Sequence, residues 1–359
     1  MTDAASVTGR RVIAHLDMDA FYVSCELRRH PELIGRPVIV AGDGPRSVVT
    51  TASYEARRFG VGSAIPASQA RRLCPQGVFL VPDFNYYRSI SGQVMQAIRH
   101  RVEQVEVMGL DEAYLDLSKH SAPLRLMRSL VGEIKATTGL DASVGIGPNK
   151  LVAKVASDAE KPLGFVVMSG DMAQQRFAGE PVTLIPGIGG KTAERLQGLG
   201  IQTIAQLAGA DECELLSVFT TRTASHLRSL ARFEHDGAVT ELRKVHSESR
   251  ERTFDNDIRL QSELDQALRG LVEELCKALV EQDRAGRTVG IKVRLDDFST
   301  HTRARTLSGP VSTVAEVEPV VLELLRTFGM PRPVRLLGVR VSALGRGGAL
   351  SHEQLALAI

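Results

Sequence analysis

Residues 106–117 constrain the fold more than any other part of this chain. Apolar and polar residues alternate on both sides of Asp111 and Glu112, which is the pattern of half-buried strands joined at a hairpin. The apolar residues predicted to face the core are Val105, Val107, Ala113, Leu115 and Leu117. Two neighbouring carboxylates at the connection repel each other, and a divalent cation between them removes that repulsion. A solvated turn is the alternative, because the same dipeptide at Asp211-Glu212 is predicted to be the acidic first turn of a helix.

Length and composition indicate an ordinary multidomain globular protein. A chain of 359 residues predicts roughly two to four domains. The net charge of +2 is too small to indicate nucleic acid by itself, so a polyanion-binding surface would need local clustering of the 44 Lys and Arg residues. The four cysteines form no CxxC pair, which predicts neither a disulfide framework nor a zinc site. Because the sequence has no apolar run of 18 residues and no signal-peptide core, we expect a cytoplasmic protein without membrane contact.

A second acidic pair follows the first predicted strand, residues 12–16. Asp17-Met18-Asp19 ends this strand, and an amphipathic helix is predicted over residues 20–29. Acids at the carboxyl end of a central strand lie where α/β folds bind ligands. Asp19 is expected to cap the helix. Asp17 is still in the strand register, so it is a candidate metal ligand together with Asp111 and Glu112.

The order of predicted elements indicates a ferredoxin-like sheet. A helix over 83–101, the hairpin, a helix over 123–138 and a strand over 142–146 complete a split βαβ pattern, and residues 31–82 are inserted into it. Within the insertion, Tyr54 and Arg57 share one helix face. A hydroxyl beside a guanidinium suits phosphate oxygens, although a surface stack of ring and guanidinium is the alternative.

Residues 184–196 carry a helix-hairpin-helix signature. Gly187 and Gly189 would let backbone N–H groups approach a DNA phosphate, and the helix that begins near Lys191 adds its dipole. A tight turn between helices is the alternative. The motif predicts binding to the DNA backbone without sequence preference.

A second βαββαβ unit is predicted beyond a polar tether at 241–249. Its strands carry eight basic residues, and strand alternation is expected to bring many of them onto one sheet face as a cradle for DNA, with a solvated face as the alternative. These residues are Arg250, Arg252, Lys292, Arg294, Arg303, Arg305, Arg335 and Arg340. A glycine-rich stretch at 345–348 leads to a C-terminal peptide with apolar residues that would be poorly placed in water, unless they fold back on this unit.

Four motifs occur in one order: residues 15–22, 52–57, 111–116 and 161–164. So arranged, they closely resemble the Y-family translesion DNA polymerases, most like the DNA polymerase IV branch, over nearly the whole chain. The resemblance implies an α+β multidomain fold with a ferredoxin-like palm (1–30 and 83–170), inserted fingers (31–82) and a small helical thumb with the helix-hairpin-helix (171–240). A linker (241–249), a βαββαβ little finger (250–344) and a flexible tail (345–359) follow.

The resemblance also implies residue roles. Asp17, Asp111 and Glu112 would be catalytic and would ligate two Mg²⁺ ions, which Mn²⁺ can replace, with help from the Met18 carbonyl. Tyr54, Arg57 and Lys161 would grip the incoming triphosphate. Tyr22 would be the steric gate beneath the deoxyribose, with Phe21 the weaker candidate. The clamp-binding residues of the tail would be Gln354, Leu355, Leu357 and Ile359.

The implied activity is template-directed addition of deoxynucleotides to a primer, with low fidelity because no segment is left for a proofreading exonuclease. The expected partners are primer-template DNA, deoxynucleoside triphosphates and a sliding clamp, and we expect a monomer. Two features depart from the family pattern: Gly109 stands where many relatives carry serine, and the tail lacks the aromatic residue of the strongest clamp-binding peptides. A nucleotidyl cyclase and a catalytically silent DNA-binding subunit are the rival functions. The helix-hairpin-helix disfavours the first, and the presence of all three acids disfavours the second.

Overall fold

The computed structural model describes residues 11–241 and 244–346, which divide into two compact units. The first unit contains residues 11–42 and 48–241, and the second contains residues 43–47 and 244–346. Each unit has its own hydrophobic core. In the described part of the chain, none of the helices is long and apolar enough to cross a lipid bilayer.

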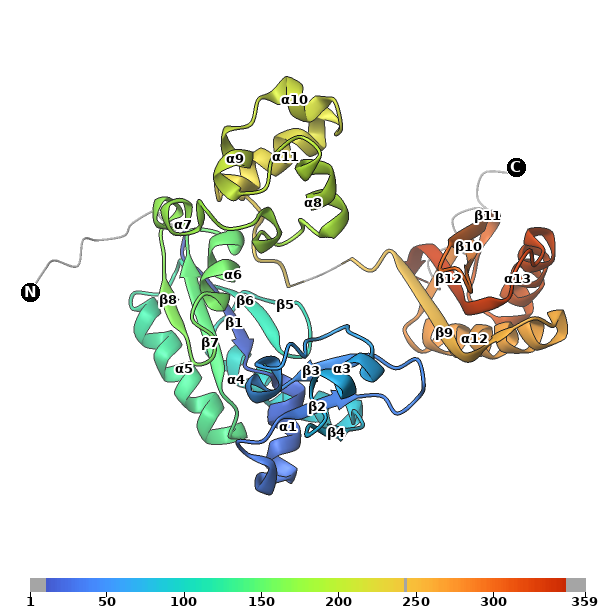
Figure 1. Cartoon of the computed structure of the whole chain (residues 1–359), viewed down its shortest axis with the longest axis horizontal. Coiled ribbons are helices and arrows are strands. Elements are labelled where there is room, and N and C mark those ends of the chain that lie inside the picture. The colour runs from blue at the N-terminus through green and yellow to red at the C-terminus, as the bar shows by residue number, and fades with distance from the viewer. Residues whose placement is uncertain (1–10, 242–243, 347–359) are drawn as a thin grey trace, which may run out of the picture. The chain divides into compact units, whose positions relative to one another are not determined.

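The first unit is built on a five-stranded sheet in the order β5-β6-β1-β7-β8 (Figure 1). Its strands are β1 (Ile13–Met18), β5 (Val105–Val107), β6 (Glu112–Asp116), β7 (Ala142–Gly147) and β8 (Phe165–Val167). The central strand, β1, pairs antiparallel with both β6 and β7. This is the predicted ferredoxin-like arrangement, which is confirmed. The short strand β8, which was not predicted, adds a parallel edge next to β7.

Helices cover both faces of this sheet. The helices α1 (Phe21–Arg29), α4 (Phe84–Arg101) and α5 (Pro123–Thr138) pack on one face, against alternate apolar residues of β1 and β6 such as Leu16 and Leu115. The helix α6 (Lys150–Asp158) packs on the other face, against β1 and β7. Gly145 in β7 permits this packing, because a Cβ atom there would collide with the backbone of α6 at Ala153 and Ser157.

Most of the inserted segment at 31–82 forms a small sheet in the order β3-β2-β4. Its strands are β2 (Val38–Ala41), β3 (Val49–Ala52) and β4 (Val78–Leu80), and its helices are η1 (Pro31–Leu33), α2 (Tyr54–Arg57) and α3 (Ala67–Leu73). The strand β4 was not predicted, because three residues give too short a pattern. Ala56 is fully buried, which fixes α2 on the small core and leaves Tyr54 and Arg57 at its two ends.

Short helices follow, as predicted for the thumb: α7 (Gly170–Phe177), η2 (Val182–Leu184), α8 (Gly190–Gln197), α9 (Ile204–Gly209), α10 (Glu212–Leu216) and α11 (Thr221–Ala231). Their core includes Leu151, Val152 and Val155 of α6, so α6 lies between the main sheet and the helical segment. Asp211 caps α10 through the Cys213 N–H, and Glu212 begins that helix. The interpretation of Asp211-Glu212 as an acidic first turn is therefore confirmed.

The chain leaving α11 lies against the main sheet, and we call residues 236–240 the strap. The Arg11 guanidinium donates to the carbonyl oxygens of Asp236 and Gly237, at 3.3 and 2.7 Å. The Thr240 N–H donates to Glu106 Oε2 at 3.0 Å. Between these contacts Val239 is buried in a small cluster with Ile13, Tyr114 and Ala153. The strap thus attaches to the face of the sheet that also carries α6.

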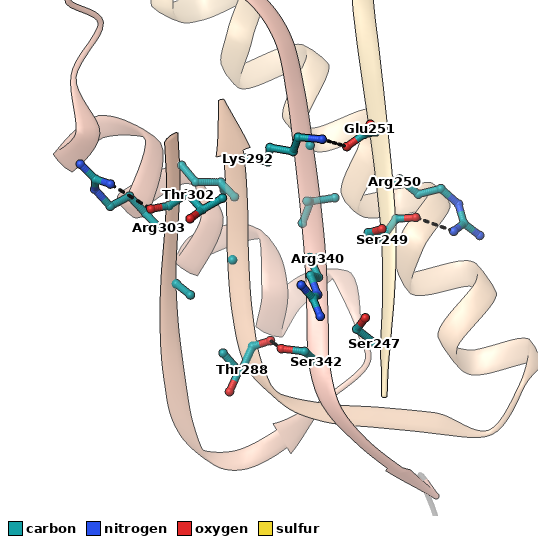
Figure 2. Close-up of a pocket in the computed structure, with 15 residues that line it drawn as sticks. Ser247, Ser249, Arg250, Glu251, Thr288, Lys292, Thr302, Arg303, Arg340 and Ser342 are labelled. Carbon is teal, nitrogen blue, oxygen red and sulfur yellow. Dashed lines mark hydrogen bonds and ion pairs between the residues drawn. The ribbon is translucent and has the colours of Figure 1, made fainter. Parts of the chain in front are cut away.

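The second unit has the predicted order of elements: β9 (Ser247–Ile258), α12 (Gln261–Glu281), β10 (Arg284–Leu295), β11 (Thr300–Val311), α13 (Val314–Phe328) and β12 (Val334–Arg346). Its sheet runs β11-β10-β12-β9, which differs from the order in the first unit. Both helices pack on one face, against residues such as Ile291 and Val339. The opposite face is hollowed by a concavity of about 510 Å³ (Figure 2).

Two predicted boundaries of this unit are wrong. Residues 247–249, placed in the tether, belong to β9 and pair with Ser342, Val341 and Arg340 of β12. Gly345 and Arg346, placed in the flexible tail, belong to β12 and pair with β10. Polar and glycine-rich composition concealed both strand ends, because a strand with one face open to solvent needs few apolar residues.

We expect Gly145→Ala to destabilise the protein by about 1–3 kcal/mol, because the added methyl group must push α6 away from β7. Gly132→Ala is the matched control, since Gly132 lies within α5 and a Cβ atom there meets open space. That change should be neutral or stabilise by up to about 1 kcal/mol. Urea unfolding of both variants checks the prediction, and equal stability would contradict the close packing.

Candidate active site

The predicted acids gather where β1 and β6 end. Asp17 in β1 lies directly opposite Glu112 in the antiparallel register, and the Met18 N–H donates to the Asp111 carbonyl at 2.9 Å. Glu112 is the first residue of β6, so only Asp111 lies in the connection. The alternation that was predicted for the hairpin is confirmed, since Ala113, Leu115 and Leu117 are buried and Val105 and Val107 belong to the same core.

Two lysines that sequence reasoning did not connect with the acids reach them. Lys154 Nζ lies 2.9 Å from Asp17 Oδ2 and 3.0 Å from Glu112 Oε2. Lys161 Nζ lies 2.7 Å from Asp17 Oδ1 and equally close to Asp158 Oδ1. Burial opposes the charge of each lysine, yet the surrounding carboxylates raise both pKa values. Lys150 and Lys154 are four residues apart, so they lie on one face of α6. This spacing, on the helix that leads to Lys161, was the sequence signal that could have pointed to Lys154.

The pKa values of the neighbouring acids Asp111 and Glu112 are shifted in opposite directions. Burial, with the charges of Asp17 and Glu112, raises the pKa of Asp111 to about 6. Contact with His15, together with the Lys154 ammonium, lowers the pKa of Glu112 to about 2 in spite of burial. In the protein without bound metal, Glu112 is therefore ionised at neutral pH, and Asp111 is the acid that gains most from an added cation.

His15 is fully buried behind Glu112. Its Nδ1 lies 2.8 Å from Ser157 Oγ, and that Oγ also lies 2.8 Å from the Lys154 carbonyl oxygen. Its Nε2 lies 3.3 Å from Glu112 Oε2. Burial lowers the pKa of the imidazole. His15 thus braces the Glu112 carboxylate against α6.

The donor set fits a divalent cation. Ligand atoms of His15, Asp17 and Glu112 lie within 4.8 Å of one another. Lys154 Nζ already sits between the last two carboxylates, which shows that this position favours positive charge. Carboxylate oxygens, with Asp111 adjoining, are the ligands that Mg²⁺ prefers.

Tyr54 and Arg57 lie side by side, as predicted. The Arg57 guanidinium stacks on the Tyr54 ring at 4.5 Å from its centre, so the stack that was held as an alternative is present. The Tyr54 hydroxyl donates to Asp19 Oδ1 at 3.2 Å. The prediction that Asp19 caps α1 is wrong: the residue at the cap position is Ala20, and the Asp19 carboxylate turns instead toward Tyr54, Ser143 and Leu163.

The two candidates for the steric gate differ in exposure. Phe21 is only 2 % exposed and belongs to the main core. Tyr22 is half-buried and rests in an aromatic group with Phe84 and Tyr87, with ring centres 5.8 and 4.8 Å away. Tyr22 is therefore the one of the two that can meet a ligand.

The helix-hairpin-helix glycines adopt the geometry that their motif requires. Gly187 has a φ of 95°, which favours glycine, and Gly189 immediately precedes α8. A Cβ atom at either position would meet open space, so the backbone here is accessible. The first N–H groups of α8, including that of Lys191, have no partner within the helix.

The eight basic residues of the second unit do not share one face. Lys292 and Arg340 lie on the open face, as do Thr302 and Ser342 (Figure 2). The register puts Arg294, two residues after Lys292, on the same face. The pairing register puts Arg303 opposite Ile291 and Arg305 opposite Val289, on the face that the helices cover. Arg250 and Arg252 lie opposite Val339 and Leu337 on that same face. Arg335 stacks on the Phe298 ring at 4.4 Å.

Ion pairs confirm this division between the faces. Arg252 contacts Glu274 of α12, and Arg305 contacts Glu323 of α13. The expectation that alternation gathers many of these residues on one face is wrong for these strands. Gln354, Leu355, Leu357 and Ile359 lie outside the described residues.

Comparison with known proteins gives consistent matches. Residues 16–158 match the impB/mucB/samB family, and residues 245–357 match its C-terminal domain. Proteins named DNA polymerase IV are 41% identical in Methanoculleus marisnigri, over 95% of this chain and 96% of the relative, and 42% identical in Alkalilimnicola ehrlichii, over 97% and 99%. A Y-family DNA polymerase chimera of Dbh and Dpo4 has a similar fold, with a TM-score of 0.82 at 24% identity over 92% of this chain and 98% of that one.

The fold and these matches define a Y-family DNA polymerase architecture. The chain belongs to the impB/mucB/samB family, among relatives named DNA polymerase IV, which confirms the resemblance to that branch drawn from the motifs.

We expect Asp111→Asn and Glu112→Gln to change stability in opposite directions in protein freed of metal by a chelator. Ionised Asp111 destabilises the fold above about pH 6, because its pKa is raised on folding, so Asp111→Asn should stabilise by about 1–3 kcal/mol at pH 7.5. This gain should disappear as the pH falls below 3.8, the unfolded value. Glu112→Gln should destabilise at pH 7.5, with the loss shrinking as the pH falls from 4.5 toward 2. Urea unfolding at several pH values measures both, and shifts of the same sign would contradict the assignment.

Proposed function

We propose that this chain is a template-directed DNA polymerase of the translesion type, which adds deoxynucleotides to a primer 3′ end. The observation that carries the proposal is the register of β1 and β6, which sets Asp17 opposite Glu112 beside Asp111. Tyr54 is tied to the same strand end through Asp19, and Lys161 reaches Asp17 directly. A carboxylate group beside a hydroxyl, a guanidinium and an ammonium suits phosphoryl transfer from a nucleoside triphosphate.

Asp17, Asp111 and Glu112, with the Met18 carbonyl, would hold two Mg²⁺ ions, and Mn²⁺ could replace them. When bound, these ions would lower the pKa of the primer hydroxyl and stabilise the developing charge on the phosphates. Tyr54, Arg57 and Lys161 would bind and orient the triphosphate. Lys161 is already ionised and lies next to Asp17, so it needs only a small side-chain movement to reach a phosphate oxygen.

Tyr22 would exclude ribonucleotides by packing beneath the deoxyribose. Its half-buried ring is supported by Phe84 and Tyr87, so it could not move aside easily for a 2′-hydroxyl. Phe21 supports the core behind it.

DNA would be held through its backbone by two surfaces. Gly187, Gly189 and Lys191 would offer N–H groups and a positive charge to one phosphate. The open sheet face would offer Lys292, Arg294 and Arg340 to others, and Gly290 and Gly338, which have no side chains to fill it, line the concavity on this face. The arginines on the helix-covered face would contribute less.

The remaining proposals follow from family membership. They are low fidelity without proofreading, a monomeric state, a cytoplasmic location and binding of the C-terminal peptide to a sliding clamp.

We expect Asp111→Ala and Glu112→Ala each to reduce primer extension more than tenfold, because each removes charge stabilisation of several kcal/mol from the transition state, about 1.4 kcal/mol being a factor of ten. Affinity for primer-template should be retained, since the helical segment and the second unit would supply it. Primer extension and fluorescence anisotropy measure the two quantities. A variant that keeps more than about a tenth of parental extension would refute the site.

We expect the triple variant Lys292→Ala, Arg294→Ala and Arg340→Ala to weaken DNA binding and to lower the slope of log affinity against log salt by about 2–3. The matched control is Arg252→Ala, Arg303→Ala and Arg305→Ala, which removes the same charge from the helix-covered face. The control should change the slope by less than about 1. Anisotropy titrations over a range of NaCl concentrations test this, and equal effects would place DNA elsewhere.

A further inference from the structure

Asp19 holds together three segments that are distant in sequence. It follows β1 and is only 4 % exposed. Its Oδ1 accepts from the Tyr54 hydroxyl at 3.2 Å, and its Oδ2 accepts from the Leu163 N–H at 2.8 Å. Ser143 Oγ donates between them, at 2.9 Å from Oδ1 and 3.1 Å from Oδ2. One carboxylate therefore joins α2, β7 and the loop after α6 to the end of β1.

The environment of Asp19 differs from that of Asp17, two residues earlier. The hydrogen bonds that the structure gives the Asp19 carboxylate all come from uncharged donors. Asp17, by contrast, contacts the ammonium groups of Lys154 and Lys161. Both Asp19 oxygens are already used by these donors, so Asp19 is a fixed connection rather than another cation ligand.

One arm of this connection reaches Arg57 through Tyr54. The Tyr54 hydroxyl has a single proton, and donating it to Asp19 fixes the ring. The Arg57 guanidinium stacks on that ring, and its Nε donates to the Ala52 carbonyl at 3.0 Å. The position of the guanidinium thus depends on where Asp19 holds the ring.

The other arm reaches Lys161. Leu163, whose N–H binds Asp19, is two residues after Lys161 and has a φ of 63°, a conformation that side chains rarely adopt. The next residue, Gly164, donates its N–H to Ser143 Oγ at 3.1 Å. The pair Asp19–Ser143 therefore accepts from two successive N–H groups and fixes the loop that carries Lys161.

We propose that Asp19 is a positioning residue for nucleotide binding, which holds Tyr54, Arg57 and Lys161 in one constellation before the triphosphate arrives. This inference rests on the proposed function, because it takes those three residues to be the triphosphate ligands. Asp19 touches neither substrate nor metal in this role. It acts by removing the conformational freedom that the three side chains would otherwise lose on binding.

The test is Asp19→Asn, which keeps the size of the side chain but replaces one acceptor by a donor. The KM for the incoming deoxynucleotide should rise about tenfold, the typical effect of losing a hydrogen bond to a charged group, while kcat changes less than about threefold. Steady-state single-nucleotide primer extension gives both constants. A KM within about twofold of the parent, or a fall in kcat at constant KM, would overturn the proposal.

Glu26→Gln is the matched control. Glu26 is equally buried, at 4 % exposure, and its Oε1 also accepts from a tyrosine hydroxyl, that of Tyr87, at 2.7 Å. A purely structural effect of replacing a buried carboxylate would appear in both variants as a lower melting temperature. Only Asp19→Asn should raise KM, and an equal rise in Glu26→Gln would overturn the specific role.

If Asp19→Asn does not fold, Ser143→Ala provides the same test, because it removes the hydroxyl that contacts both Asp19 oxygens and the Gly164 N–H. It should raise KM for the deoxynucleotide, and an unchanged KM would overturn the proposal. Failure of the proposed function would look different: the parent protein itself would not extend a primer.

Discussion

The antiparallel pairing of β1 with β6 is the constraint on which the rest of the first unit depends. It places Asp17 opposite Glu112 at the end of a buried sheet, where two carboxylates repel strongly. The Lys154 ammonium offsets this repulsion, because α6 crosses the same face closely enough for Lys154 to contact both acids. That closeness in turn requires glycine at 145. The contact of Lys154 with both acids and the glycine at position 145 thus both go with the close approach of α6 to the sheet.

Much of this unit could be predicted from the sequence, because its signals are local. Alternation over residues 105–117 gave the hairpin and its buried face, and the spacing of apolar residues gave α5 with its observed bounds. The acids could be placed because they lie at the ends of such patterns. The role of Asp19 could not be predicted, since helix capping satisfies a local rule and two of its three observed partners, Ser143 and Leu163, are more than a hundred residues away.

The basic strands of the second unit show a different limit. Side chains on a strand alternate, so the face of each arginine depends on the register, and a shift of one residue reverses it. Sequence gives the arginines but not the partner of each. Arg303 and Arg305 lie opposite Ile291 and Val289, while Lys292 lies opposite Thr302. Glu274 and Glu323 of the covering helices then form ion pairs with Arg252 and Arg305, which no local sequence pattern predicts.

The strap limits the length of chain between the first unit and β9. Six residues, 241–246, separate Thr240, the last residue of the strap, from the start of β9. Release of residues 236–240 from the sheet would lengthen this span by the five residues of the strap. It would first have to draw Val239 out of its cluster, at a cost of about 1.5–3 kcal/mol, and break the Thr240–Glu106 bond. A force that pulls the strap off the sheet would therefore have to supply the free energy of exposing Val239. That side chain packs against Ile13 and Tyr114, which lie in the same two strands that carry the acids.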